Sequence, residues 1–230
     1  MGDHDLLFLI LGIVIPFIIQ FTIFPFLPKS VQGFAMYQKK KIMKIIRQSE
    51  VNTELVVKTE RYVGDATVDE AITIIQKKIG GIFKIRNESR NLIVDVPIGT
   101  NTIQVTIIPI HRVDNEVLKF ESLECRFTAK CRFHKFNACV RDFREAQRKI
   151  EDILHDTITP HFKTDLALIC KLKSLYEITD ILKGTNFESM SAELDNGKQF
   201  EISKNGITIY DKDINDDVIS LAEKMIVVYG

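Results

Sequence analysis

The stretch from Leu6 to Leu27 places the strongest constraint on how this chain folds. Of its 22 residues, 17 are Leu, Ile, Phe or Val, and none is charged. A helix of this length measures about 33 Å, against roughly 30 Å for the hydrocarbon core of a bilayer. The large apolar side chains together favour insertion by at least about −5 kcal/mol. We therefore expect one transmembrane helix over residues 6–28, after a short extracytoplasmic tail of residues 1–5.

Two other interpretations agree less well with this stretch. A cleaved signal peptide begins with basic residues and ends at a small-residue cleavage site. The leader MGDHD contains no Lys or Arg, and no A-x-A pattern follows the apolar run. A buried core helix of a soluble protein would carry polar residues along one face. The sequence therefore favours a retained membrane anchor.

The basic residues near this stretch predict its orientation. None precedes it, and six follow within about 20 residues: Lys29, Lys39, Lys40, Lys41, Lys44 and Arg47. Cytoplasmic flanks carry the excess of Lys and Arg, so we expect the N-terminus outside and residues 29–230 in the cytoplasm. The four cysteines do not resemble a disulfide framework, which is consistent with a reducing compartment.

Residues 29–50 read as a basic juxtamembrane helix. Ala35, Ile42, Ile45 and Ile46 fall near one helical face, and basic side chains surround the remainder. Such a helix can lie on anionic lipid headgroups, with candidate contacts from Lys39, Lys40, Lys41, Lys44 and Arg47. The alternative is a topology signal that extends the membrane helix as a spacer, and the two roles are compatible.

The remaining residues predict an α+β fold with an antiparallel sheet and helices. An α+β domain is expected over residues 51–163. A helix, a β-meander and a C-terminal helix are expected over residues 164–230, as a separate unit or packed on the same domain. The expected strands are 55–63, 82–86, 92–96, 102–110 and 116–133, with a meander over 190–210. The expected helices are 67–80, 137–158, 164–183 and a last helix capped by Asp213.

The clearest strand signal runs from Leu123 to His134, where apolar and charged residues alternate strictly. Leu118 and Phe120 fall on the opposite parity. We therefore expect a bulge or a turn near Glu121 and Ser122 to restore the register. A helix start is equally clear at Thr67, because Glu70 follows three residues later and completes a capping-box pattern.

No motif predicts a metal, a cofactor or a familiar catalytic centre. Cys125, Cys131, His134 and Cys139 supply zinc-capable ligands, but their spacing fits no common zinc site. On an extended strand Cys125 and Cys131 lie about 20 Å apart, too far to share one ion. Phosphate-binding, dinucleotide-binding and nucleophile-elbow motifs do not occur. The sequence favours a non-enzymatic role, without excluding an enzyme that lacks these motifs.

A basic segment provides the best candidate for binding. Residues 126–149 carry eight basic side chains against two acidic ones. We expect them to contact anionic lipid or an acidic partner, such as the acidic C-terminal region of another copy; the alternative is an ordinary solvated surface. The balanced total charge does not favour nucleic-acid binding. The candidates are Arg126, Lys130 and Arg132 on the polar face of a strand, and Arg141, Arg144 and Arg148 on the outer faces of a helix.

Two functional expectations follow. The first is a single-pass membrane protein whose cytosolic domain is an interaction or scaffolding module at the inner membrane surface, with a protein partner or a second copy. The second is a pocket domain that binds a lipid or small apolar ligand, or an enzyme. A sheet curled around the helix over 137–158 would leave a cavity lined by Phe127, Phe133 and Phe143.

Overall fold

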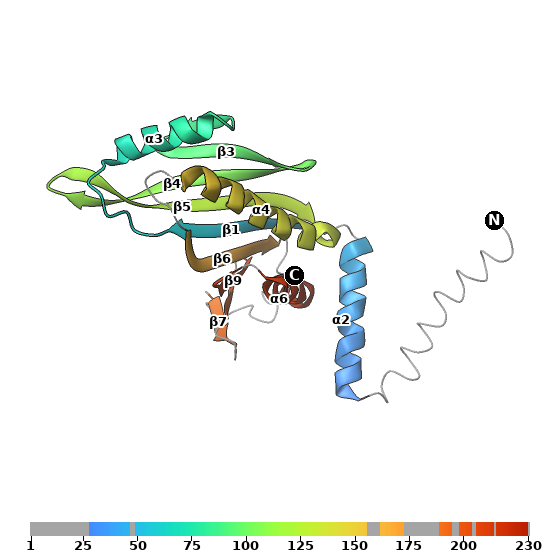
Figure 1. Ribbon diagram of the computed structural model, residues 1–230. Coiled ribbons are helices and arrows are strands. Elements are labelled where there is room, and N and C mark those ends of the chain that lie inside the picture. The colour runs from blue at the N-terminus through green and yellow to red at the C-terminus, as the bar shows by residue number, and fades with distance from the viewer. Residues whose placement is uncertain are drawn as a thin grey trace. The chain divides into compact units, whose positions relative to one another are not determined.

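The chain divides into two compact units, with the boundary after Arg47. The computed structural model describes residues 28–46, 49–155, 162–172, 189–194, 198–203, 206–213 and 215–229 (Figure 1). In the first unit it contains α2 (Lys29–Ile46), a helix in the segment where the sequence predicts one. The apolar stretch Leu6–Leu27 and Arg47 lie outside the described residues. Among the helices that are described, none combines the length and apolarity needed to cross a bilayer.

The second unit is built on a nine-stranded antiparallel sheet, and the α+β class is confirmed. The strand order is β2-β3-β4-β5-β1-β6-β9-β8-β7, so β1 is the central strand. The sheet includes strands from both sides of residue 163. The strands are β1 (Glu50–Thr59), β2 (Ile85–Glu88), β3 (Asn91–Ile98), β4 (Asn101–Asp114), β5 (Val117–Arg132), β6 (Phe162–Leu172), β7 (Ser189–Glu193), β8 (Gln199–Ser203) and β9 (Gly206–Asp211).

Three helices form a layer on one face of this sheet. They are α3 (Val68–Gly80), α4 (Phe136–Leu154) and α6 (Asp216–Tyr229), and a short 3₁₀ turn, η3 (Phe133–Lys135), precedes α4. Figure 1 shows α4 crossing the sheet. It contacts β5, β3, β1 and β4 on the sheet and both other helices in the layer. The layer therefore continues across strands from both halves of the second unit.

The core lies between the sheet and the helices. Leu55 of β1 is opposite Phe127 of β5, which is opposite Val105 of β4, and none of the three has any exposed surface. From the other side, α4 contributes Phe143 and Ile150, which are also fully buried. Because strand side chains alternate between faces, the residues that follow these core positions along each strand project from the sheet face away from the helices.

Local sequence signals determine the start of α3 and the bulge in β5. The Thr67 hydroxyl accepts a hydrogen bond from the Glu70 amide at 3.3 Å, and the Glu70 carboxylate accepts one from the Thr67 amide at 2.9 Å. This confirms the capping box. These contacts with the Thr67 backbone and side chain lower the pKa of Glu70. In β5 the register shifts where Ile110 faces Ser122 and His111 faces Phe120, so Glu121 is the extra residue and the predicted bulge is confirmed.

The predicted helix over 164–183 is wrong for its first part, because residues 162–172 form β6. Leu168 and Leu172 are four residues apart, a spacing that places residues on one face of either a helix or a strand. The strand pairs along β1, with Leu168 opposite Leu55 and Cys170 opposite Thr53. A central strand needs hydrogen-bonding partners along both edges, and this requirement favours a strand over a helix for residues 162–172. The remainder of the predicted helix lies outside the described residues.

Several predicted boundaries also need correction. β1 begins five residues earlier than expected, at Glu50, and ends at Thr59. The cap of α4 is Lys135 rather than Asn137, whose side chain instead donates to Glu223. Asn215, not Asp213, caps α6, since its side-chain oxygen accepts from the Val218 amide at 3.0 Å. The predicted meander is confirmed as β7, β8 and β9, and it extends the same sheet through β6.

Candidate functional site: the open face of the sheet

One face of the sheet carries none of the three described helices of the second unit, and we call it the open face. It consists of the residues that alternate with the buried core positions, and it combines charged, polar and aliphatic side chains. On the central strands these are Thr102, Gln104, Thr106 and Ile108 of β4, Glu124, Arg126, Thr128, Lys130 and Arg132 of β5, Glu50, Asn52, Glu54, Val56 and Lys58 of β1, and Ala167, Ile169 and Lys171 of β6.

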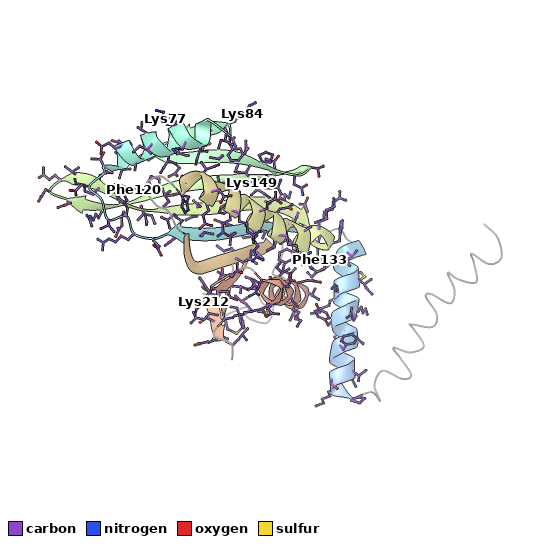
Figure 2. The ribbon with its side chains drawn as sticks, viewed as in Figure 1. Lys77, Lys84, Phe120, Phe133, Lys149 and Lys212 are labelled. Carbon is purple, nitrogen blue, oxygen red and sulfur yellow. The ribbon has the colours of Figure 1, made fainter. Side chains whose placement is uncertain are left out.

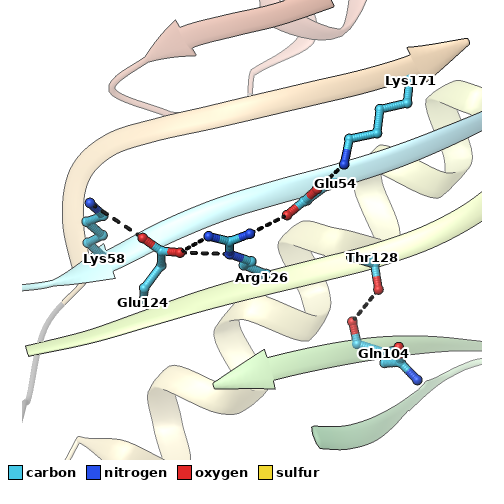
Figure 3. A network of polar contacts seen from close by, with 7 residues as sticks. All are labelled: Glu54, Lys58, Gln104, Glu124, Arg126, Thr128 and Lys171. Atoms are coloured by element: carbon cyan, nitrogen blue, oxygen red, sulfur yellow. Dashed lines mark hydrogen bonds and ion pairs between the residues drawn. The ribbon is translucent and has the colours of Figure 1, made fainter. Parts of the chain in front are cut away.

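A chain of alternating charges crosses the middle of the open face (Figure 3). Arg126 is at its centre, with Nη2 2.7 Å from Glu124 Oε1 and Nη1 3.7 Å from Glu54 Oε1. Lys58 extends the chain from Glu124 at 3.5 Å, and Lys171 extends it from Glu54 at 3.2 Å. The two carboxylate side chains are only 13% and 11% exposed, while Arg126 is 47% exposed. The network therefore neutralises two poorly hydrated carboxylates and presents cations to solvent.

Aliphatic side chains lie between these charges. Val56, Ile93, Ile108 and Ile169 on the open face are neither fully buried nor fully exposed, although they belong to interior strands. On the helix-covered face, by contrast, core side chains such as Leu55 and Val57 have no exposed surface. Apolar surface that a layer of helices would normally cover thus remains accessible to solvent or to a partner.

A hollow of about 500 Å³ also lies on the open face. Its walls carry charges of both signs together with amide and hydroxyl groups. A second hollow, of about 690 Å³, lies beside the end of α3. Neither is lined by Phe127, Phe133 or Phe143, which are 0, 4 and 0% exposed. The polar lining of the first hollow includes Asn52, Glu54, Asp95, Gln104, Lys130 and Lys171.

The six predicted basic residues of 126–149 do not form one surface. Arg126, Lys130 and Arg132 lie on the open face, where Lys130 pairs with Glu50 at 2.8 Å. The other three lie on α4, on the helix-covered side, as does Lys149 (Figure 2). Strand β5 and helix α4 are consecutive in the chain, but a sheet separates their charged side chains. The six residues therefore lie on two different faces of the second unit.

Two of the α4 arginines pair with acidic residues that precede or begin α6. Arg141 lies 3.2 Å from Asp216, and Arg144 lies 3.2 Å from Asp213. The sequence predicted an acidic C-terminal region as a partner for these residues, and within this chain that region already lies beside them. These side chains are exposed, so each pair contributes little to stability and remains open to competition. Arg148, one turn further along α4, is exposed as well.

The predicted lipid-binding residues Lys39, Lys40, Lys41 and Lys44 lie on α2 in the first unit. The same helix exposes large apolar side chains: Phe34 is 64% exposed, Ile42 is 53% and Ile45 is 41%. With 3.6 residues per turn, these three project within about 80° of one another. Ile42 and Ile45 belong to the predicted apolar face and Phe34 lies beside them, whereas Met36 and Met43, which are 55% and 38% exposed, lie on the other side of the helix.

Four members of the open-face network were not identified from the sequence, namely Glu54, Glu124, Lys58 and Lys171. Glu54 and Lys58 alternate with Leu55 and Val57, a period-two signal that was present in the sequence. Lys171 was not recoverable in this way, because its segment was expected to be helical. No group of three metal-ligating side chains that could hold an ion occurs within the described part of the chain.

Comparison with models of known protein families gave no match, and comparison with curated proteins gave no match either.

Proposed function

We propose that this chain is a single-pass membrane protein whose second unit is a protein-interaction module at the cytoplasmic surface, with the open face as its docking surface. The observation that carries the proposal is the one-sided fold: all three described helices of residues 48–230 pack on one face. The opposite face of the sheet carries accessible aliphatic and charged side chains together. The apolar stretch Leu6–Leu27 supports the membrane anchor.

The composition of the open face favours a protein over other partners. A nucleic-acid or lipid-headgroup surface presents mainly positive charge, because its ligand is a regular array of phosphates. Here Glu50, Glu54 and Glu124 alternate with the basic side chains. Charges of both signs around aliphatic patches match the polar and apolar mixture of ordinary protein interfaces.

The proposed lipid contact belongs to α2 rather than to the sheet. Its apolar stripe of Phe34, Ile42 and Ile45 would enter the boundary between headgroups and acyl chains. Lysines on the flanks would then reach anionic phosphates. This arrangement keeps the membrane-binding and partner-binding surfaces on different units of the chain.

Site-specific crosslinking tests the docking surface. A photoreactive amino acid at Val56 or Thr106, on the open face, is expected to give a discrete crosslinked product in cells that express the full chain. Matched probes at Lys77 of α3 and Arg148 of α4 lie on the helix layer, with Lys77 visible in Figure 2, and should give little product. Mass spectrometry of the products then identifies the partner. Equal yields from both faces, or products from the helix layer alone, would contradict the proposal.

Tryptophan fluorescence tests the lipid contact, because the chain contains no Trp. In nanodiscs with anionic lipid, Phe34→Trp is expected to show blue-shifted emission that brominated acyl chains quench. Met36→Trp is the control, since position 36 lies about 160° around the helix from position 34. Its native side chain is 55% exposed, close to the 64% of Phe34. Identical spectra and quenching at both positions would rule out an inserted apolar stripe.

A further inference from the structure

Strand β2 forms one border of the nine-stranded sheet, and within the described part of the chain no strand pairs along its outer side. The two-residue turn Ser89–Arg90 joins β2 to β3, and Glu88 is opposite Asn91 across that turn. In such a hairpin the two residues that flank the turn hydrogen-bond to each other, and every second pair along the strands does the same. The amide and carbonyl groups of Ile85 and Asn87 therefore point outward from the sheet, where another strand can bind them.

The hollow of about 690 Å³ beside the end of α3 adjoins this border. Its apolar wall comes from Ile82, Phe83 and Ile85, and Ile82 is 62% exposed. Gly80 and Gly81 also line it and contribute no side chain. A Cβ atom on Gly81 would meet only carbonyl oxygens of α3, at 3.6 Å or more. A strand that pairs with β2 can therefore place a large apolar side chain in the hollow.

The charge around this border is positive. Residues 76–86 carry four basic side chains and no acidic one. Lys84 and Arg86 line the hollow, and Lys84, labelled in Figure 2, makes no hydrogen bond or ion pair with the other described residues. Arg86 lies 3.4 Å from Asp95, but both side chains are about half exposed, so this pair is weak. The border therefore favours a ligand with negative charge.

We propose that the outer edge of β2 binds an extended acidic segment of a partner protein by antiparallel strand addition. Ile85 is opposite the fully buried Val94, so its side chain is on the helix-covered side of the sheet. Residues opposite each other in antiparallel strands project from the same face, with Cβ atoms about 5 Å apart. The residue of the segment opposite Ile85 is then apolar and enters the hollow. Its two neighbours, opposite Lys84 and Arg86, are acidic.

Fluorescence polarisation with the full chain in detergent tests the backbone pairing. The probe is a fluorescein-labelled synthetic octapeptide with Glu, Leu and Glu at its centre and Thr and Gly on either side. N-methylation of the Leu removes the amide that would bond to Ile85, so the affinity is expected to fall by at least about tenfold. N-methylation of the following Glu puts the methyl group on the side away from β2. This control should bind within about twofold of the parent probe.

Two changes in the chain test the hollow and the charges separately. Gly81→Leu fills the hollow, and the backbone φ of −68° at this position suits any residue. It should weaken binding of the Leu probe by about tenfold, and that of a probe with Ala in place of Leu by much less. Lys84→Glu combined with Arg86→Glu should reverse the preference, so that a probe with Lys in place of both Glu residues binds more tightly.

Lys77→Glu is the matched control for these charge changes. Lys77 lies about 100° around α3 from Gln76, which lines the hollow, and Lys77 itself does not. The substitution changes the net charge by the same amount as either single reversal, and binding of the acidic probe should change by no more than about threefold. A loss as large as that of the double reversal would show that only the overall charge matters, and the inference would fail.

Hydrogen exchange locates the bound probe, which is expected to slow exchange within residues 83–88. Protection of β7, the opposite border of the sheet, would overturn the inference. Equal affinity for the two N-methylated probes, equal affinity for the acidic and basic probes, or no binding by the wild-type chain would do the same. Slower exchange of residues 83–88 at high protein concentration without the probe would assign the border to a second copy instead. Photoreactive residues at Val56 and Thr106 report on the open face, so the docking proposed there stands or fails independently.

Discussion

Phe127→Ala is expected to lower the free energy of unfolding of residues 48–230 by about 3–5 kcal/mol. Phe127 has no exposed surface and lies between Leu55 and Val105, beneath the layer that includes α4. Truncation removes most of a large aromatic side chain and leaves a cavity that strands held on both edges cannot close. Urea denaturation of the 48–230 fragment, followed by circular dichroism, measures the change.

A surface control separates packing from general effects of substitution. Val63→Ala removes apolar atoms from a side chain that is 97% exposed, and the free energy of unfolding should change by no more than about 0.5 kcal/mol. The same comparison bears on the alternative of an apolar ligand cavity. If Phe127 lined such a cavity, its truncation would still remove buried apolar surface but would create less new void. A loss well below about 3 kcal/mol would therefore favour the pocket interpretation over a closed core.

Arg126→Glu is expected to destabilise residues 48–230 by about 2 kcal/mol at low salt. The substitution removes the cation between Glu54 and Glu124 and puts a third carboxylate in its place. Those two side chains are 11% and 13% exposed, so water screens the new repulsion incompletely. Arg126 is about half exposed, which reduces the effect below that of a fully buried ion pair. The loss should shrink as salt is added.

The matched control reverses the charge of a more exposed pair, which joins the loop after β1 to β5. Arg61 lies 3.3 Å from Glu121, and Arg61→Glu should lower the free energy of unfolding by about 0.5 kcal/mol or less. Arg126→Met tests the cause, because it removes the cation without adding a negative charge. It should fall between wild type and Arg126→Glu. Equal losses for Arg61→Glu and Arg126→Glu would show that the network adds nothing beyond ordinary surface pairing.

Those parts of the fold that local chemistry determines were predictable from the sequence. Thr67 and Glu70 specify a helix start between themselves, and the parity change at Glu121 specifies an extra residue in a strand. Residues 162–172 were not predictable in this way. Their leucine spacing fits a helix and a strand equally, and only the need of β1 for a second hydrogen-bonded neighbour favours the strand. That pairing joins residues more than a hundred positions apart in the sequence, such as Thr53 and Cys170.

The candidate site was predictable in composition but not in arrangement. Arg126 and Arg144 belong to one basic segment, and the alternation around Arg126 correctly put it on a polar strand face. Whether a following helix packs on that face or on the other depends on which side carries the larger apolar surface. Phe127 and Cys125 direct α4 to their own side, which separates Arg144 from Arg126. Of the two carboxylates that pair with Arg126, Glu124 lies on the same strand, whereas Glu54 comes from β1 and is distant in the sequence.

The position of β1 determines how the second unit would respond to mechanical force through its N-terminal connection. The strand begins at Glu50, immediately beyond the first unit, and is the fifth of nine in the sheet. Tension from a membrane tether would be applied to this strand before any other. To extract it, the pull must break the ladders to β5 and β6 together, whereas a border strand could be peeled away one bond at a time. Under the anchoring that we propose, loading at the middle strand would protect the second unit from being unravelled.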